Sequence, residues 1–124
     1  MRAESRVFAF KMIFSTLFES DLNEAKENFQ EEFSENDKAF AESILGAFTE
    51  NKSALEQELK SVLENYEIDR IYKVDLALIY LAMTEIKYIK TPKPVVVNEA
   101  LEIAKKFSTE NSSKFINGVL AKIN

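Results

Sequence analysis

Apolar residues recur every three or four positions along this chain, which is the spacing of helices with one buried face. The first stripe runs from about Glu4 to Phe18, and the second runs from about Leu22 to Phe33. Later stripes are separated by polar breaks at 34–37, 51–53, 91–94 and 108–111. No strand-like alternation and no fixed-period repeat accompany them. The pattern therefore predicts an all-α fold of six or seven helices.

The segment from about Asp69 to Ile89 is apolar on nearly every side, which is typical of a central helix that others surround. Its uncharged core, from Leu76 to Met83, is far shorter than the roughly 20 residues that span a bilayer. The apolar run near the amino terminus is interrupted by Lys11 and lacks a small-x-small cleavage site. We therefore expect no membrane segment and a cytoplasmic protein.

The chain contains only two glycines, and both fall inside predicted helices, where glycine costs about 1 kcal/mol relative to alanine. Gly46 therefore indicates a close approach by another helix. In the last helix the spacing turns four residues toward the core: Ile116, Val119, Leu120 and Ile123. Lys114, Asn117 and Gly118 then share the opposite face, where the approaching group is either a neighbouring helix or an RNA or protein partner.

The composition favours binding over catalysis. The chain has no His and no Cys, which removes thiolate nucleophiles, structural zinc sites and imidazole acid–base chemistry. Glu99 and Glu102 could serve a small hydrolase only if one pocket enclosed both carboxylates, and such a pair beside Lys106 is typical of a solvated helix face. We expect no enzyme activity, no cofactor and no metal site.

Charge is distributed unevenly, although the net charge is −5. Residues 1–18 carry a net charge of +2, residues 19–69 carry −11 and residues 70–124 carry +4. Arg2, Arg6 and Lys11 are candidates for phosphate contacts. We expect the first and last helices to lie side by side and to present a shared cationic strip. The alternative is that the acidic middle only keeps the protein soluble.

Two adjacent blocks in the last third carry a family resemblance. The block from Val97 to Phe107 resembles the INEAxELAKxF/Y signature of the NusB family of transcription antitermination factors, and Thr109 to Leu120 resembles its closing xENSxKFVNGVL block. Upstream, Val74, Asp75, Ala82 and Glu85 are similar to the family's VDRxxLRxAxYEL helix, in which Leu76 and Tyr80 replace arginines and Thr84 replaces the tyrosine. Arg2, Arg6, Ala9, Ile13 and Phe14 fit its RxxxRxxAxxxLF/Y start.

This resemblance implies two three-helix bundles packed at an angle, in a single domain over residues 1–124. It implies a factor that pairs with NusE, a protein of the small ribosomal subunit. The pair binds boxA-type single-stranded RNA and joins the RNA polymerase elongation complex during ribosomal RNA transcription. The implied RNA contacts are Arg2 and Arg6, with the closing-motif residues Lys114, Asn117 and Gly118, while Glu85 lies on the NusE side.

A different class of function also fits the residues. Exposed Tyr and Phe side chains on the second and third helices could form a protein–protein interface with no role in RNA binding. Such a module could be a dimer, and the chain is therefore expected to be either a monomer or a homodimer.

Overall fold

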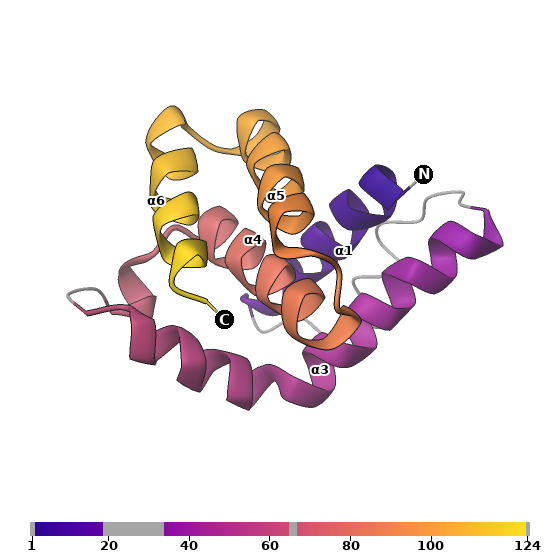
Figure 1. Cartoon of the computed structure of the whole chain (residues 1–124), viewed down its shortest axis with the longest axis horizontal. Helices are drawn as coiled ribbons and strands as arrows, with labels where there is room; N and C mark the ends of the chain where they lie inside the picture. The colour runs from indigo at the N-terminus through magenta and orange to yellow at the C-terminus, as the bar shows by residue number, and fades with distance from the viewer. Residues whose placement is uncertain (1, 19–33, 65–66, 124) are drawn as a thin grey trace.

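The computed structural model describes residues 2–18, 34–64 and 67–123. These contain five α-helices and no strand: α1 (Arg2–Thr16), α3 (Glu35–Val62), α4 (Lys73–Thr84), α5 (Lys93–Phe107) and α6 (Glu110–Ala121) (Figure 1). A 3-10 turn (Ile68–Arg70) precedes α4 and a π-helical turn (Glu85–Ile89) follows it. The all-α prediction is confirmed. The helix predicted from Leu22 to Phe33 lies outside the described residues.

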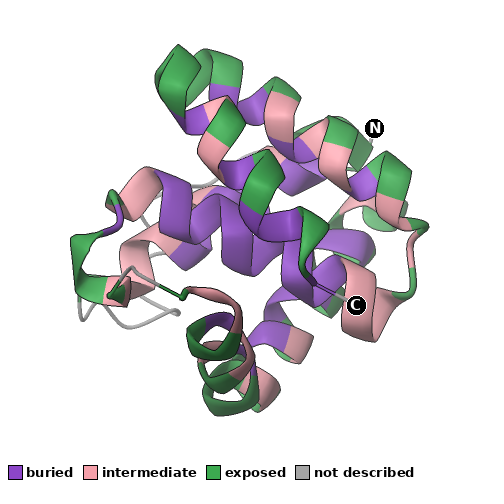
Figure 2. Ribbon diagram, turned by 60° about the vertical axis from the view of Figure 1, so that its left-hand side comes forward, coloured by how far each residue is buried: buried purple, intermediate pink, exposed green. Residues whose placement is uncertain are grey.

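Helix α4 is the centre of the fold, as its apolar pattern predicts. Every residue from Asp75 to Thr84 is buried, and Figure 2 shows this segment enclosed by the others. Helices α1 and α3 pack on each other and on α4, whereas α5 and α6 pack on each other and on α4. The two groups of helices therefore share α4 as their common core, consistent with the expected pair of bundles.

The break predicted at 51–53 is a kink within one helix. Helix α3, 28 residues long in all, continues through this break. Only Asn51 leaves helical geometry, with φ −117° and ψ 16°. The Asn51 side chain donates a hydrogen bond of 2.8 Å to the carbonyl of Ala47. Because the buried stripe of Phe48, Leu55 and Leu59 keeps helical spacing across the polar residues, packing overrides the local preference for a loop.

The other helix ends follow from local chemistry. The Ser34 hydroxyl accepts a hydrogen bond from the Asp37 amide and caps α3, and the Thr109 hydroxyl accepts one from the Ser112 amide and caps α6. Pro94 lies in the first turn of α5, where no amide hydrogen is required. Lys90 takes a left-handed conformation, with φ 67°, and ends the π-helical turn.

One expectation about helix proximity is wrong, and a second finds no support among the described residues. Helix α6 packs on α4 and α5 while α1 packs on α3 and α4, and α5 stands between α1 and α6 in Figure 1. Helices α1 and α6 therefore form no shared cationic strip, because they pack on different sides of α4. Gly46 is exposed, and a Cβ atom added there would meet no described atom within 4 Å, so none of the described helices approaches it.

Candidate nucleic-acid interface

Arg6 and Glu85 form a buried ion pair. The Nε atom of Arg6 lies 2.9 Å and 3.0 Å from the two carboxylate oxygens of Glu85, and Nη2 binds the same group. The exposed fractions of the two side chains are only 7% and 1%. Glu99 approaches the other side of the guanidinium at 3.9 Å. The two residues assigned to separate RNA and partner surfaces thus hold each other inside the protein.

The two arginines of α1 form no exposed patch together. Arg2 is exposed and places its guanidinium 4.4 Å from the ring centroid of Phe40, on α3. Arg6 lies 5.3 Å from the same ring centroid. Arg6 shares the helical spacing of Ala9 and Ile13, both fully buried, and this spacing is the sequence feature that predicts its position. Only Arg2 therefore offers a surface cation at this end of α1.

The second half of α1 lies beside the end of α5 and carries aromatic rings. The Phe10 ring is 5.3 Å from that of Phe107, and the Phe14 ring is 5.0 Å from that of Phe18, between centroids. Phe10, Phe14 and Phe107 line an open cavity of about 320 Å³ together with Val74 and Lys11. Lys11, predicted to contact phosphate, therefore borders an apolar hollow at the surface.

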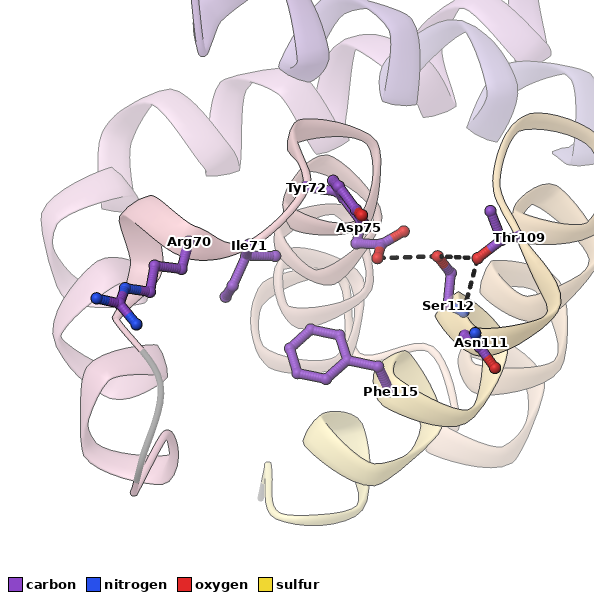
Figure 3. Close-up of a pocket in the computed structure, with 8 residues that line it drawn as sticks. All are labelled: Arg70, Ile71, Tyr72, Asp75, Thr109, Asn111, Ser112 and Phe115. Atoms are coloured by element: carbon purple, nitrogen blue, oxygen red, sulfur yellow. Dashed lines mark hydrogen bonds between the residues drawn. The ribbon is translucent and has the colours of Figure 1, made fainter.

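This cavity continues toward α6. Phe14, Val74 and Phe107 also line a second hollow of about 410 Å³, which reaches Tyr72 and Thr109. Tyr72 and Thr109 then line a third, of about 390 Å³ (Figure 3). We call the three adjoining hollows together the aromatic groove and define it by its principal lining residues: Phe10, Lys11, Phe14, Arg70, Tyr72, Lys73, Val74, Asp75, Phe107, Thr109, Asn111 and Phe115.

Two aromatic rings of the aromatic groove are unusually exposed for their size. Tyr72, at the start of α4, is 75% exposed, and Phe107, at the end of α5, is 43% exposed. The apolar spacing of α5 predicts that Phe107 is buried, and this prediction is wrong, because its ring packs on Phe10 and still remains largely exposed. Large exposed rings beside one another mark an interaction surface.

The exposed face of α6 continues the aromatic groove. Ile116, Val119, Leu120 and Ile123 are buried, as predicted, and Lys114, Asn117 and Gly118 are exposed on the other side. Asn111, Phe115 and Gly118 follow one another at helical spacing, so Gly118 lies one turn beyond the third hollow. A Cβ atom at Gly118 would meet no described atom within 4 Å. None of the helices in the described residues therefore accounts for this glycine.

The charges along the aromatic groove favour an anionic ligand. Three cations, Lys11, Arg70 and Lys73, line it beside one carboxylate, that of Asp75, and Lys114 is exposed on α6. Arg70, Lys73 and Lys114 have no ion-pair partner within the described part of the chain. Exposed aromatic rings beside such cations suit single-stranded nucleic acid, because bases stack on rings while phosphates meet the cations.

The structure supplies no geometry for acid–base catalysis by the glutamate pair. Glu99 approaches Arg6, whereas Glu102 binds Lys105 at 3.0 Å on the exposed side of α5. The two carboxylates thus have different partners. Across residues 2–18, 34–64 and 67–123, no three acidic side chains gather closely enough to hold a metal ion.

The positions that differ from the family's central motif lie in the core. Leu76 and Tyr80 are both buried in α4, and the Tyr80 ring packs on Phe48, with 5.8 Å between centroids. Burial and the nearby Glu56 carboxylate raise the pKa of Tyr80 to about 12, so its hydroxyl is neutral at physiological pH. These two positions therefore add no charge to a binding surface.

Comparisons with known proteins agree with this architecture. A family model described as the NusB family matches residues 3–124. The transcription antitermination protein NusB of Listeria monocytogenes serotype 4a is 40% identical over 124 residues, covering 98% of this chain and 94% of its own. The corresponding protein of Clostridium botulinum, strain Loch Maree, is 36% identical over 138 residues, covering 98% of each chain.

Solved structures show the same fold. NusB of T. maritima superposes with a TM-score of 0.91 and 33% identity, covering 99% of this chain and 89% of that one. A complex of the antitermination factors NusB and NusE with double-stranded RNA contains a chain with a TM-score of 0.84 and 21% identity, covering 98% of this chain and 94% of that one. No helix among the described residues is long and apolar enough to cross a membrane.

Proposed function

The chain belongs to the NusB family, and we propose that it promotes transcription antitermination by binding boxA-type single-stranded RNA together with NusE. The proposal includes a single RNA-binding domain over residues 1–124, a cytoplasmic location and association with the RNA polymerase elongation complex. It describes a binding protein without enzyme activity. The complex of NusB and NusE with double-stranded RNA supports NusE and RNA as partners, through a protein of the same fold.

The aromatic groove is the observation that carries this proposal. Tyr72 and Phe107 present exposed ring faces, and stacking on such faces stabilises a bound base by about 1–3 kcal/mol. Lys11, Arg70 and Lys73 border the same depression, where they can contact the backbone phosphates of a strand laid along it. A duplex would keep its bases stacked and could not use these rings, so the geometry favours a single strand.

The other predicted site residues take different positions in this proposal. Lys114 supplies a phosphate contact beyond the aromatic groove, while Asn117 and Gly118 form the open helix face along which the strand passes. Arg2 supplies a peripheral contact at the far end of α1. Arg6 and Glu85 act from within, by holding α1 to the turn after α4. Glu85 supports the NusE side through this pair, since its side chain is buried.

A titration tests the proposal directly. Fluorescence anisotropy of a labelled boxA-type RNA should rise on addition of the protein and should saturate at a lower protein concentration when NusE is present. Affinity should fall with salt by about 0.7 log units per log unit for each phosphate contact. The absence of binding at low salt, with and without NusE, would reject the proposal.

The alternative of a protein–protein module has less support. Its aromatic interface requires exposed rings on the second and third helices, but Phe40 and Phe48 of α3 are buried. Phe29 and Phe33 lie outside the described residues. Light scattering on the same samples determines whether a monomer or a homodimer binds. NusE binding without any RNA binding would favour the alternative.

A further inference from the structure

Asp75 is a carboxylate buried in the first turn of α4 without a basic partner among the described residues. It is 3% exposed, and it lines the floor of the third hollow of the aromatic groove. One carboxylate oxygen accepts a hydrogen bond of 2.7 Å from the Ser108 hydroxyl. The other accepts one of 3.0 Å from the Ser112 hydroxyl, which Figure 3 shows. Within the described part of the chain, the hydrogen bonds to this carboxylate therefore come from two serine hydroxyls.

The two serines lie on opposite sides of the turn between α5 and α6. Ser108 ends α5 and Ser112 lies in the first turn of α6, with the cap residue Thr109 between them. The hydroxyl oxygens of Ser108 and Ser112 are 2.6 Å apart, and that of Thr109 is 3.1 Å from Ser112. Asp75 thus ties the start of α4 to both sides of this turn.

A buried charge is a costly way to join two elements, because an apolar side chain of similar volume serves stability at least as well. A carboxylate bound by two hydroxyls does fix orientation, since charge-assisted hydrogen bonds are short and directional. The segments that this carboxylate joins also supply lining residues of the third hollow. Tyr72 directly precedes α4, and Asn111 and Phe115 lie near Ser112 on α6.

We propose that Asp75 is a positioning residue for RNA binding, which acts through Ser108 and Ser112 to hold Phe115 and Asn111 of α6 across the aromatic groove from Tyr72. This inference rests on the proposed function. It requires no contact between Asp75 and RNA. Its consequence is that weakening the hydroxyl network lowers RNA affinity even though the exposed rings and cations are all still present.

The test removes one hydroxyl and leaves all charges in place. Ser112→Ala should lower affinity for labelled boxA-type RNA by about tenfold, comparable with the loss of a hydrogen bond to a charged group. Ser113→Ala is the matched control, because Ser113 is the next residue on α6 and lies outside the network. It should leave RNA affinity unchanged. Ser112→Thr, which restores a hydroxyl, should bind at least threefold more tightly than Ser112→Ala.

A double-mutant cycle with Phe115→Ala separates positioning from general destabilisation. If the network acts through Phe115, Ser112→Ala should have little further effect in the Phe115→Ala background, whereas general destabilisation gives additive losses. NusE affinity and the helical circular dichroism spectrum should stay unchanged in each variant. If Ser112→Ala disrupts folding, Ser108→Ala replaces it in the same cycle, because Ser108 donates to the other carboxylate oxygen.

The outcomes separate this inference from the proposed function. The role of Asp75 would be overturned by wild-type RNA affinity in both serine variants or by additive losses in the cycle. The proposed function would survive that result if Phe115→Ala still weakened RNA binding. Unchanged RNA affinity in Phe115→Ala itself would instead reject the aromatic groove as the RNA site.

Discussion

The two halves of α1 use their long side chains in opposite ways. In the first half, Arg6 turns inward to Glu85, and Arg2 lies against the Phe40 ring. In the second half, Phe10, Phe14 and Lys11 line an open groove. A charged residue on the buried stripe of a helix becomes part of the internal structure, whereas Phe14 stays half-buried beside the groove while Phe10 packs in the core. The type of residue therefore does not identify the binding surface until its helical face is known.

This difference predicts that replacing Arg6 mainly lowers the stability of the fold. Arg6→Met leaves Glu85 buried without its partner and should lower the free energy of unfolding by about 3–5 kcal/mol. Urea denaturation followed by circular dichroism measures the change. Arg6→Met combined with Glu85→Leu should recover much of the loss, because both charges are then absent. A change below about 1 kcal/mol in the single variant would show that the pair is not buried as described.

The second half of α1 and its neighbours should show the reverse behaviour. Tyr72→Ala removes a ring that is 75% exposed, so the free energy of unfolding should hardly change. RNA affinity should fall by roughly tenfold or more, since one stacked base is worth about 1–3 kcal/mol. Val95→Ala is the control: Val95 is 45% exposed on α5 and lies outside the aromatic groove, so anisotropy should report wild-type affinity. Equal effects of the two variants would contradict the assignment.

The cations of the aromatic groove should determine the salt dependence. Arg70→Gln and Lys73→Gln should each reduce the slope of log affinity against log salt by about 0.7, the contribution of one phosphate contact. Lys60→Gln, on α3, removes a cation paired with Glu56 at 3.5 Å and should leave the slope unchanged. Titrations at several salt concentrations measure the slopes. A slope that changes only in Lys60→Gln would place the RNA on α3.

The two glycines provide the finest comparison. Both lie in helices with open space around the missing Cβ atom, so Gly46→Ala and Gly118→Ala should each raise the free energy of unfolding by up to about 1 kcal/mol. Only Gly118→Ala should weaken RNA binding, by a few-fold, because only Gly118 continues the aromatic groove. Thermal denaturation and RNA titration of the pair test this. Equal RNA affinity in both variants would remove Gly118 from the interface.

The sequence predicts most of the fold because the apolar stripes set which faces are buried. It identifies α4 as central and assigns the faces of α6 correctly. It predicts a loop at 51–53 where α3 has only a kink at Asn51, because a loop preference is weaker than a continuous buried stripe. It also places α1 beside α6, because spacing within a helix contains no information about which helices become neighbours.

The candidate site is harder to predict, since it depends on what the fold leaves uncovered. Charge, spacing and the family motif point to Lys11, Lys114, Asn117 and Gly118, which stay predictions. Tyr72 and Phe107 were missed, because an aromatic residue beside a buried helix usually joins the core. Arg70 and Lys73 were missed because isolated cations gain meaning only when a groove brings them together.

Nuclear magnetic resonance of the labelled protein, titrated with boxA-type RNA in the presence of unlabelled NusE, tests the central claim most directly. The reference spectrum is that of the protein saturated with NusE before RNA is added, so that the remaining chemical-shift changes depend on RNA alone. The largest shifts should fall on the amides of Tyr72, Lys73, Asn111 and Phe115, which line the aromatic groove. Shifts confined to the first two turns of α1 and to Phe40, with the aromatic groove unperturbed, would contradict the account.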